Sequence, residues 1–240
     1  MPPEVYILVL GAFLAAFVVG AAGFGDALAA AAVWLHVFEP SVAAPLIVMT
    51  GLTIHVIALA RLYKELDFKF LVPFLGLGAL GVPIGTWLLS QIAAEPFRLA
   101  VGALLFLYGA GLLAMRNPPV LKAGGKFLDA IAGGIGGVLG GLAGMSGAIP
   151  AAWCGLRGWP KQQARGVAQP YILAMHILSL ASMAWAGLMT WETATRFLWG
   201  LPAIIVGTVI GIALYRRLNE QLFRRLVLAM LTVSGLALVI

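Results

Sequence analysis

Charged residues are scarce in this chain: Asp, Glu, Lys and Arg make up 10% of its 240 residues, against about 25% in soluble domains. Too little polar surface remains to cover a water-soluble fold, which excludes a cytosolic enzyme, a nucleic-acid-binding domain and a disordered regulator. The single cysteine, Cys154, excludes an intramolecular disulfide framework, a cysteine-rich zinc site and a cysteine-ligated iron–sulfur cluster. Alternation of polar and apolar residues is also missing, so no transmembrane β-barrel is expected.

Apolar residues dominate instead, at 62% of the chain with a mean hydropathy of +1.03. Most charge-free runs reach the roughly 17–25 residues that a helix needs to cross a bilayer. They cover 5–25, 40–60, 70–94, 99–115, 130–156, 166–191, 197–215 and 226–240. The sequence therefore predicts an all-α, polytopic integral membrane protein of one domain, with the lipid bilayer as its surroundings and no nucleic-acid partner. Because residues 1–4 lack a basic segment, the first run is expected to be a retained span.

Two stretches, 5–38 and 127–156, are too long for one crossing and rich in glycine. About 30 residues of helix would extend about 45 Å. Each stretch therefore suggests two short helices that meet at a glycine break, at Gly20–Asp26 and at Gly141–Gly147. The alternative is one long helix that packs closely on its neighbours through small residues.

The sequence also repeats itself. An offset of 121 residues places Gly20–Gly25 on Gly141–Ser146 and His55 on His176, two of only three histidines. We therefore expect repeat one over 1–115, a polar linker over 116–126 and repeat two over 127–240 within a single membrane domain.

The basic residues indicate how the two halves are oriented. Thirteen of the fifteen lie in the loops 61–69, 116–126, 157–165 and 216–225, and such loops face the cytoplasm. Loops that correspond in the two repeats differ in charge, so the repeats are predicted to be inverted. Each would hold a broken or re-entrant glycine-rich hairpin followed by three transmembrane helices, with both termini periplasmic. Arg165 is expected to anchor its helix at the cytoplasmic interface.

Inverted repeats with broken helices are typical of secondary transporters, which bind substrate near the midplane. A helix that begins inside the membrane exposes unpaired amides at its positive end, which favours an anion. The candidate substrate-binding residues are those of the two breaks and of the helices beside them: Gly23, Phe24, Gly25, Asp26, Gly144, Met145, Ser146, Gly147, His55, His176, Thr50 and Gln169.

Asp26, His55 and His176 are also candidates for proton coupling, because they are among the few titratable groups in the spans. Two alternatives stay open. The histidines could form an interhelical hydrogen bond that only fixes packing, and Asp26 could cap the N-terminus of a half-helix.

The duplicated motifs, Gly20-Ala21-Ala22-Gly23-Phe24-Gly25 and Gly137-Val138-Leu139-Gly140-Gly141-Leu142-Ala143-Gly144-Met145-Ser146-Gly147, resemble those of the TauE/SafE (TSUP) family of sulfite and organosulfonate exporters. The stretch Lys161–Arg165 and the Gly81–Gly85 segment fit as well, and the resemblance covers nearly the whole chain. It implies a bacterial inner-membrane carrier of small sulfur-containing anions such as sulfite, thiosulfate or organosulfonates, by export or import. Asp26 and the pair Met145-Ser146 depart from the commoner pattern, which bears on the identity of the anion.

No cofactor, metal or catalytic residue is expected, and the assembly is expected to be a monomer or a homodimer. The nearest alternative is an anion channel. A membrane-embedded enzyme would need a nucleophile–base pair or a metal cluster, and three dispersed histidines argue against it.

Overall fold

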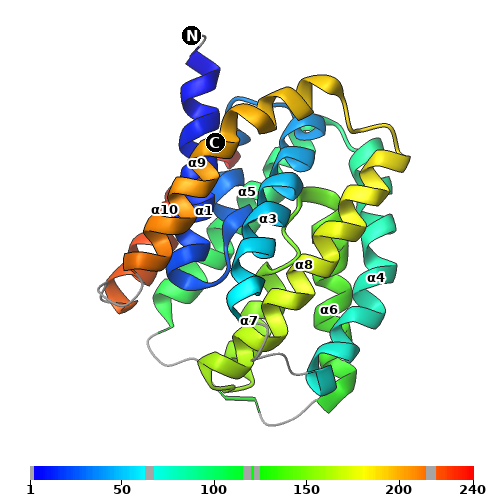
Figure 1. The fold of residues 1–240 in the computed structure, drawn as a ribbon. Helices are drawn as coiled ribbons and strands as arrows, with labels where there is room; N and C mark the ends of the chain where they lie inside the picture. The colour runs from blue at the N-terminus through cyan, green and yellow to red at the C-terminus, as the bar shows by residue number, and fades with distance from the viewer. Residues whose placement is uncertain (1–2, 63–67, 116–119, 122–124, 215–219) are drawn as a thin grey trace.

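The computed structural model describes residues 3–62, 68–115, 120–121, 125–214 and 220–240. Ten helices account for nearly all of this part of the chain (Figure 1). They are α1 (Pro3–Ala22), α2 (Asp26–Trp34), α3 (Pro40–Leu62), α4 (Phe68–Gln91), α5 (Ala94–Ala114), α6 (Gly125–Ala143), α7 (Ala148–Leu156), α8 (Lys161–Trp185), α9 (Trp191–Leu214) and α10 (Glu220–Val239).

The helices follow one order twice. A long helix and a nine-residue helix form a hairpin, and three further helices complete each half. Seven helices are long and apolar enough to cross a membrane, and the described apolar part of α10 is shorter. This confirms the predicted all-helical membrane fold. The expected linker, 116–126, lies largely outside the described residues.

The hairpins differ from the sequence prediction in the length of their first arms. With 20 and 19 residues, α1 and α6 are long enough to span a bilayer, whereas nine residues of α2 or α7 extend only about 13.5 Å. The expectation of two short helices is therefore wrong for the first arm. The breaks themselves are present, with φ of +89° at Gly23, +98° at Gly25 and +71° at Gly144. A single straight helix is thus excluded.

Most of the glycines of α6 serve close packing instead of breaking the helix. A Cβ on Gly137 would lie 2.8 Å from the Cα of Gly78 in α4, too close for a side chain. Likewise, a Cβ on Gly207 of α9 would lie 2.6 Å from the carbonyl oxygen of Phe13 in α1. The two halves are therefore intertwined: α4 of the first packs on α6 of the second, and α9 of the second packs on α1 of the first.

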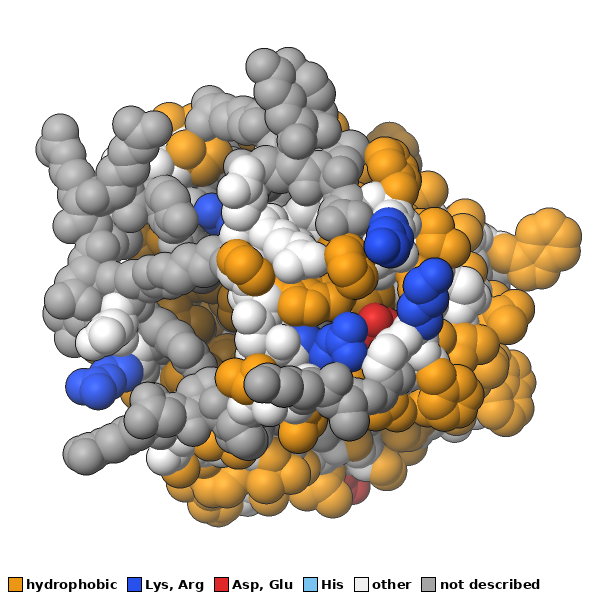
Figure 2. Space-filling view, turned by 90° about the horizontal axis from the view of Figure 1, so that it is seen from below, with side chains coloured by type: hydrophobic (Ala, Val, Ile, Leu, Met, Phe, Trp, Pro, Cys, Tyr) orange, Lys and Arg blue, Asp and Glu red, His pale blue; other side chains and the backbone are white. Residues whose placement is uncertain are grey.

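Figure 1 also shows how the halves are oriented. Helix α1 runs downward from the N-terminus, its counterpart α6 runs upward, and both chain termini lie at the upper end. The halves are therefore inverted. The helix ends that flank the four basic loops lie at the lower end, which we call the basic end. Figure 2 looks onto it and shows Lys and Arg side chains among hydrophobic ones. Helices α3 and α8 pack against each other in the middle of the molecule.

Candidate functional site

Both short helices begin in the interior of the protein, next to the glycine breaks. Gly25 is the N-cap of α2 and Gly147 is the N-cap of α7, and neither supplies a side-chain hydrogen bond. The first-turn amides of a helix have no acceptor within the helix itself. Each break therefore places the positive end of a helix dipole inside the fold. At α7 the amide of Ala148 donates to the carbonyl oxygen of Met145 at 3.3 Å and Pro150 has no amide hydrogen, so Ile149 is the remaining donor of the first three residues.

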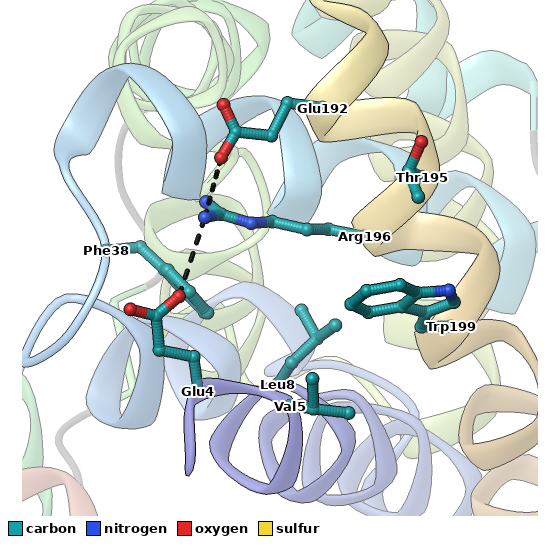
Figure 3. Close-up of a pocket in the computed structure, with 8 residues that line it drawn as sticks. All are labelled: Glu4, Val5, Leu8, Phe38, Glu192, Thr195, Arg196 and Trp199. Carbon is teal, nitrogen blue, oxygen red and sulfur yellow. Dashed lines mark ion pairs between the residues drawn. The ribbon is translucent and has the colours of Figure 1, made fainter. Parts of the chain in front are cut away.

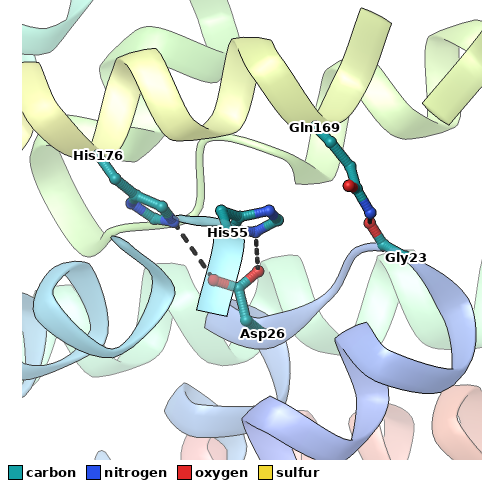
Figure 4. Close-up of polar contacts among 5 residues, drawn as sticks. All are labelled: Gly23, Asp26, His55, Gln169 and His176. Atoms are coloured by element: carbon teal, nitrogen blue, oxygen red, sulfur yellow. Dashed lines mark hydrogen bonds and ion pairs between the residues drawn. The ribbon is translucent and has the colours of Figure 1, made fainter. Parts of the chain in front are cut away.

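The carboxylate of Asp26, the first residue of α2, lies between two imidazoles (Figure 4). Its Oδ1 is 3.4 Å from His55 Nε2 and its Oδ2 is 3.3 Å from His176 Nε2. The exposed fractions are 4% for Asp26, 1% for His55 and 0% for His176. The N-cap of α2 is Gly25, so the capping role considered for Asp26 is wrong; its carboxylate is directed at the histidines.

The two histidines come from corresponding positions of the repeats, His55 on α3 and His176 on α8, and their ring centroids lie 5.7 Å apart. Both Nδ1 atoms are buried and have no hydrogen-bond partner among the described residues. Each ring can thus donate its Nε2 proton to Asp26 and keep Nδ1 as an open acceptor. We call Asp26, His55 and His176 the central triad.

Gly51 of α3 makes room for the triad, a role that no sequence motif indicated. A Cβ on Gly51 would lie 2.9 Å from His176 Cδ2, and closer still to His176 Nε2 and Asp26 Oδ2. Any side chain here would push the carboxylate away from the imidazole. Thr50, predicted as a site residue, is buried one position earlier in the same helix.

The first break is held by α8 of the other half. Gln169 donates from Nε2 to the carbonyl oxygen of Gly23 at 2.9 Å, and the guanidinium of Arg165 packs against Gly23, with Nε 2.5 Å from the position of a Cβ there. Arg165 therefore reaches the break, which corrects its assignment as an interfacial anchor. Phe24 is half-buried and packs with aromatic residues of the smaller hydrophobic cluster.

The second break is held by α3, α6 and α8. Gly144 packs against Ile47 of α3, and Met145 is buried in the main hydrophobic core. Two serines are fully buried here: Ser146 in the break itself and Ser179 on α8. Their hydroxyls have no partner in the described part of the chain. Both border Gly140 of α6, which lacks a side chain. Ser179 was not identified from the sequence, because its counterpart at the repeat offset is Ala58.

The triad could also hold a metal ion, since one ligand atom from each residue lies within 4.8 Å of the others, and two imidazoles with a carboxylate suit Zn²⁺ or another transition metal. A metal on both Nε2 atoms would place protons on both Nδ1 atoms. Metal-bound imidazoles normally donate that proton to a carboxylate, carbonyl or water, and neither Nδ1 has such an acceptor among the described residues. A protonated imidazole carries a hydrogen on the same Nδ1 atom, so the geometry admits either a metal ion or a proton at this site.

A separate cavity of about 300 Å³ lies at the end that carries the termini, between α1 and α9 (Figure 3). Arg196 lines it, pairs with Glu192 at 2.7 Å and Glu4 at 3.6 Å, and lies over the ring of Phe38. Two carboxylates already balance this cation, so the cavity is a poor anion site and lies apart from the triad.

The fold and the buried polar centre define a polytopic membrane protein built from two inverted halves around one shared site. The sequence model of the sulfite exporter TauE/SafE family matches residues 8–238. The chain therefore belongs to the TauE/SafE family of membrane transporters, which confirms the resemblance. No curated protein and no solved structure matches the chain.

Proposed function

We propose that this protein is a secondary carrier of small sulfur-containing anions, such as sulfite, thiosulfate or organosulfonates, in the bacterial inner membrane. The observation that carries the proposal is the central triad, which is buried at the N-terminus of α2 and draws its residues from both halves. The basic end would face the cytoplasm and both termini the periplasm. Whether the carrier works as a monomer or a homodimer stays a prediction.

The second break is the better place for the anion. In the first turn of α7 the amide of Ala148 donates to the carbonyl oxygen of Met145 at 3.3 Å and Pro150 has no amide hydrogen, which leaves the amide of Ile149 as a donor; a helix N-terminus binds oxyanions through such donors. The buried hydroxyls of Ser146 and Ser179 lie beside it and have no partner among the described residues. Leaving such donors unsatisfied is costly, so an oxyanion that accepts from both would stabilise the occupied state. At the first break, the carboxylate of Asp26 already lies at the positive end of α2.

The triad would couple the anion to a proton. Each imidazole has an open Nδ1 that can take up a proton, and the charged ring then pairs with the carboxylate of Asp26 through Nε2. In this state the centre attracts an anion. After that proton leaves, the remaining protonated imidazole is balanced by the carboxylate of Asp26, so no positive charge is left for the anion and its release is favoured.

Transport would proceed by alternating access. All three triad residues and both serines are buried, so the described structure is closed around the site. Each break contacts the opposite half: Gly23 meets α8 and Gly144 meets α3. A relative movement of the two halves would therefore open the site, as in other inverted-repeat carriers.

The test is uptake of labelled isethionate, sulfite and thiosulfate into liposomes that contain the purified protein, driven by a pH gradient. We expect uptake, and acceleration by the same anion loaded inside, which a channel does not show. Substitution of both histidines, His55→Gln with His176→Gln, should abolish the uptake that the pH gradient drives. Unchanged pH-driven uptake in that variant would refute proton coupling. No uptake or thermal stabilisation with any of the anions, alongside stabilisation by a cation or neutral solute, would refute the assignment.

A further inference from the structure

The two halves are not equivalent at their breaks. The repeat offset pairs Asp26 with Gly147, and Gly51 with Ile172. In the first half the carboxylate of Asp26 fills the space beside Gly51; in the second, Ile172 fills the space beside Gly147, with its Cδ1 2.5 Å from the position of a Cβ there. The larger side chain thus stands at the start of the short helix in the first half, as Asp26, and on the long helix in the second half, as Ile172. The centre therefore holds two imidazoles but only one carboxylate.

The other titratable groups near the triad do not share its environment. On α8, Arg165 lies eleven residues before His176, about 16.5 Å along the helix, and its guanidinium packs at Gly23 instead of at the triad. The hydroxyl of Tyr171, on the same helix, donates to the carbonyl oxygen of Gly133. On α6, Asp129 accepts from Trp153 and lies 3.7 Å from Arg157.

Helix α2 has no other titratable group, and the charged groups of α1 and α9 with described side chains lie at the termini-bearing end. Within the described part of the chain, the triad sets the charge of the buried centre.

A buried centre near the middle of a membrane is costly unless its charges balance. Without substrate, one carboxylate is balanced by one protonated imidazole. A bound monoanion is balanced when the second imidazole takes up a proton. A dianion leaves one negative charge without a partner, because the triad holds no third imidazole. The greatest anionic charge that the centre balances is therefore the number of imidazoles minus the number of carboxylates, which is one.

On the basis of the carrier function proposed above, we propose that the protein transports monoanions, each together with one proton, and rejects dianions. The transported species are then singly charged oxyanions such as organosulfonates or bisulfite, and not dianions such as sulfate or thiosulfate, which narrows the class of anions proposed above. Because each proton cancels the charge of one anion, the cycle moves no net charge, and a membrane potential does not drive it.

The experiment compares isethionate, a monoanion, with sulfate, a dianion, in liposomes that contain the full-length protein, with the membrane potential clamped. For the natural chain we expect isethionate uptake with one proton per anion, a rate that does not change with potential, and no sulfate uptake above empty liposomes. Natural protein that carries sulfate as fast as isethionate would overturn the charge rule and leave the carrier function standing. Absence of all anion uptake would instead refute the carrier function itself.

Variants of the triad test the rule in both directions. Asp26→Asn removes the carboxylate, so two protonated imidazoles balance a dianion, and sulfate uptake should rise at least about tenfold over the natural chain. His55→Gln leaves one imidazole against one carboxylate, so isethionate uptake should be lost. The double variant, Asp26→Asn with His55→Gln, again balances one charge and should regain isethionate uptake but not sulfate uptake.

The matched control is Asp129→Asn, which neutralises a second buried carboxylate away from the triad. The asparagine can still accept from Trp153, and we expect no gain of sulfate uptake. Asp26→Asn protein that melts like the natural chain but gains no sulfate uptake would overturn the proposal. If Asp26→Asn does not fold, a second pair of variants decides. His176→Gln should lose isethionate uptake, and the double variant, Asp26→Asn with His176→Gln, should regain it. Failure of the double variant to regain isethionate uptake would overturn the proposal.

Discussion

Gly51 offers the sharpest test of the geometry of the triad. In Gly51→Ala the new Cβ would lie 2.9 Å from His176 Cδ2 and closer still to Asp26 Oδ2, where ordinary contacts begin at 3.4 Å. Both neighbours are at most 4% exposed, so they can move only by separating from each other. A hydrogen bond to a charged group contributes about 1.5–3 kcal/mol, and its loss should lower anion uptake by roughly tenfold or more.

Stability should change in the same variant as the sum of two opposing effects. Alanine in place of a glycine within a helix stabilises by about 0.4–1 kcal/mol, whereas overpacking costs about 1–3 kcal/mol. We expect a net loss of about 1 kcal/mol, seen as a lower Tm in detergent. Gly76→Ala in α4 is the matched control, because no atom lies within 4 Å of its Cβ position; it should keep uptake and raise the Tm slightly. Equal uptake and Tm in the two variants would refute the packing of the triad against Gly51.

Three further predictions concern other parts of the fold. Gly23→Ala should lower the Tm by an amount equivalent to about 1–3 kcal/mol, because φ is +89° there and Arg165 occupies the space of the new methyl group; an unchanged Tm would contradict this. Trp153→Phe removes the donor that lies 2.7 Å from Asp129 and should cost about 1.5–3 kcal/mol in thermal unfolding, and a Tm equal to that of the natural chain would count against it. A cysteine in place of Ile240, which is 95% exposed, should react with an impermeant maleimide on intact cells; reaction only after lysis would reverse the predicted topology.

The helix order and the breaks could be predicted from the sequence for physical reasons. A backbone with φ near +90° favours glycine, so Gly23 and Gly25 mark the first break, and the distribution of basic loops reports orientation. The pairing of His55 with His176 could be anticipated because a repeat maps each onto the other. Their shared contact with Asp26 required the fold, since only the first half carries the carboxylate.

Other features could not be predicted because one residue type serves two purposes. Glycines in α6 look like those of a break, yet Gly137 stays helical and admits the backbone of α4. The unequal arms of the hairpins follow from this ambiguity. Charge counting placed Arg165 at the interface, but its long side chain reaches Gly23. Gly51 stood in no motif, because its role depends on a helix more than a hundred residues further along the chain.

The intertwined packing also determines when the protein can become complete during synthesis. Helix α1, over Pro3–Ala22, has its most extensive packing partner in α9, over Trp191–Leu214. Helix α1 is made long before α9, so the side of α1 that α9 covers must face lipid or an insertion factor until the later helix follows. The packing of α1 is therefore completed late in biogenesis. A truncation that removes α9 should destabilise α1 as much as the helices next to the cut.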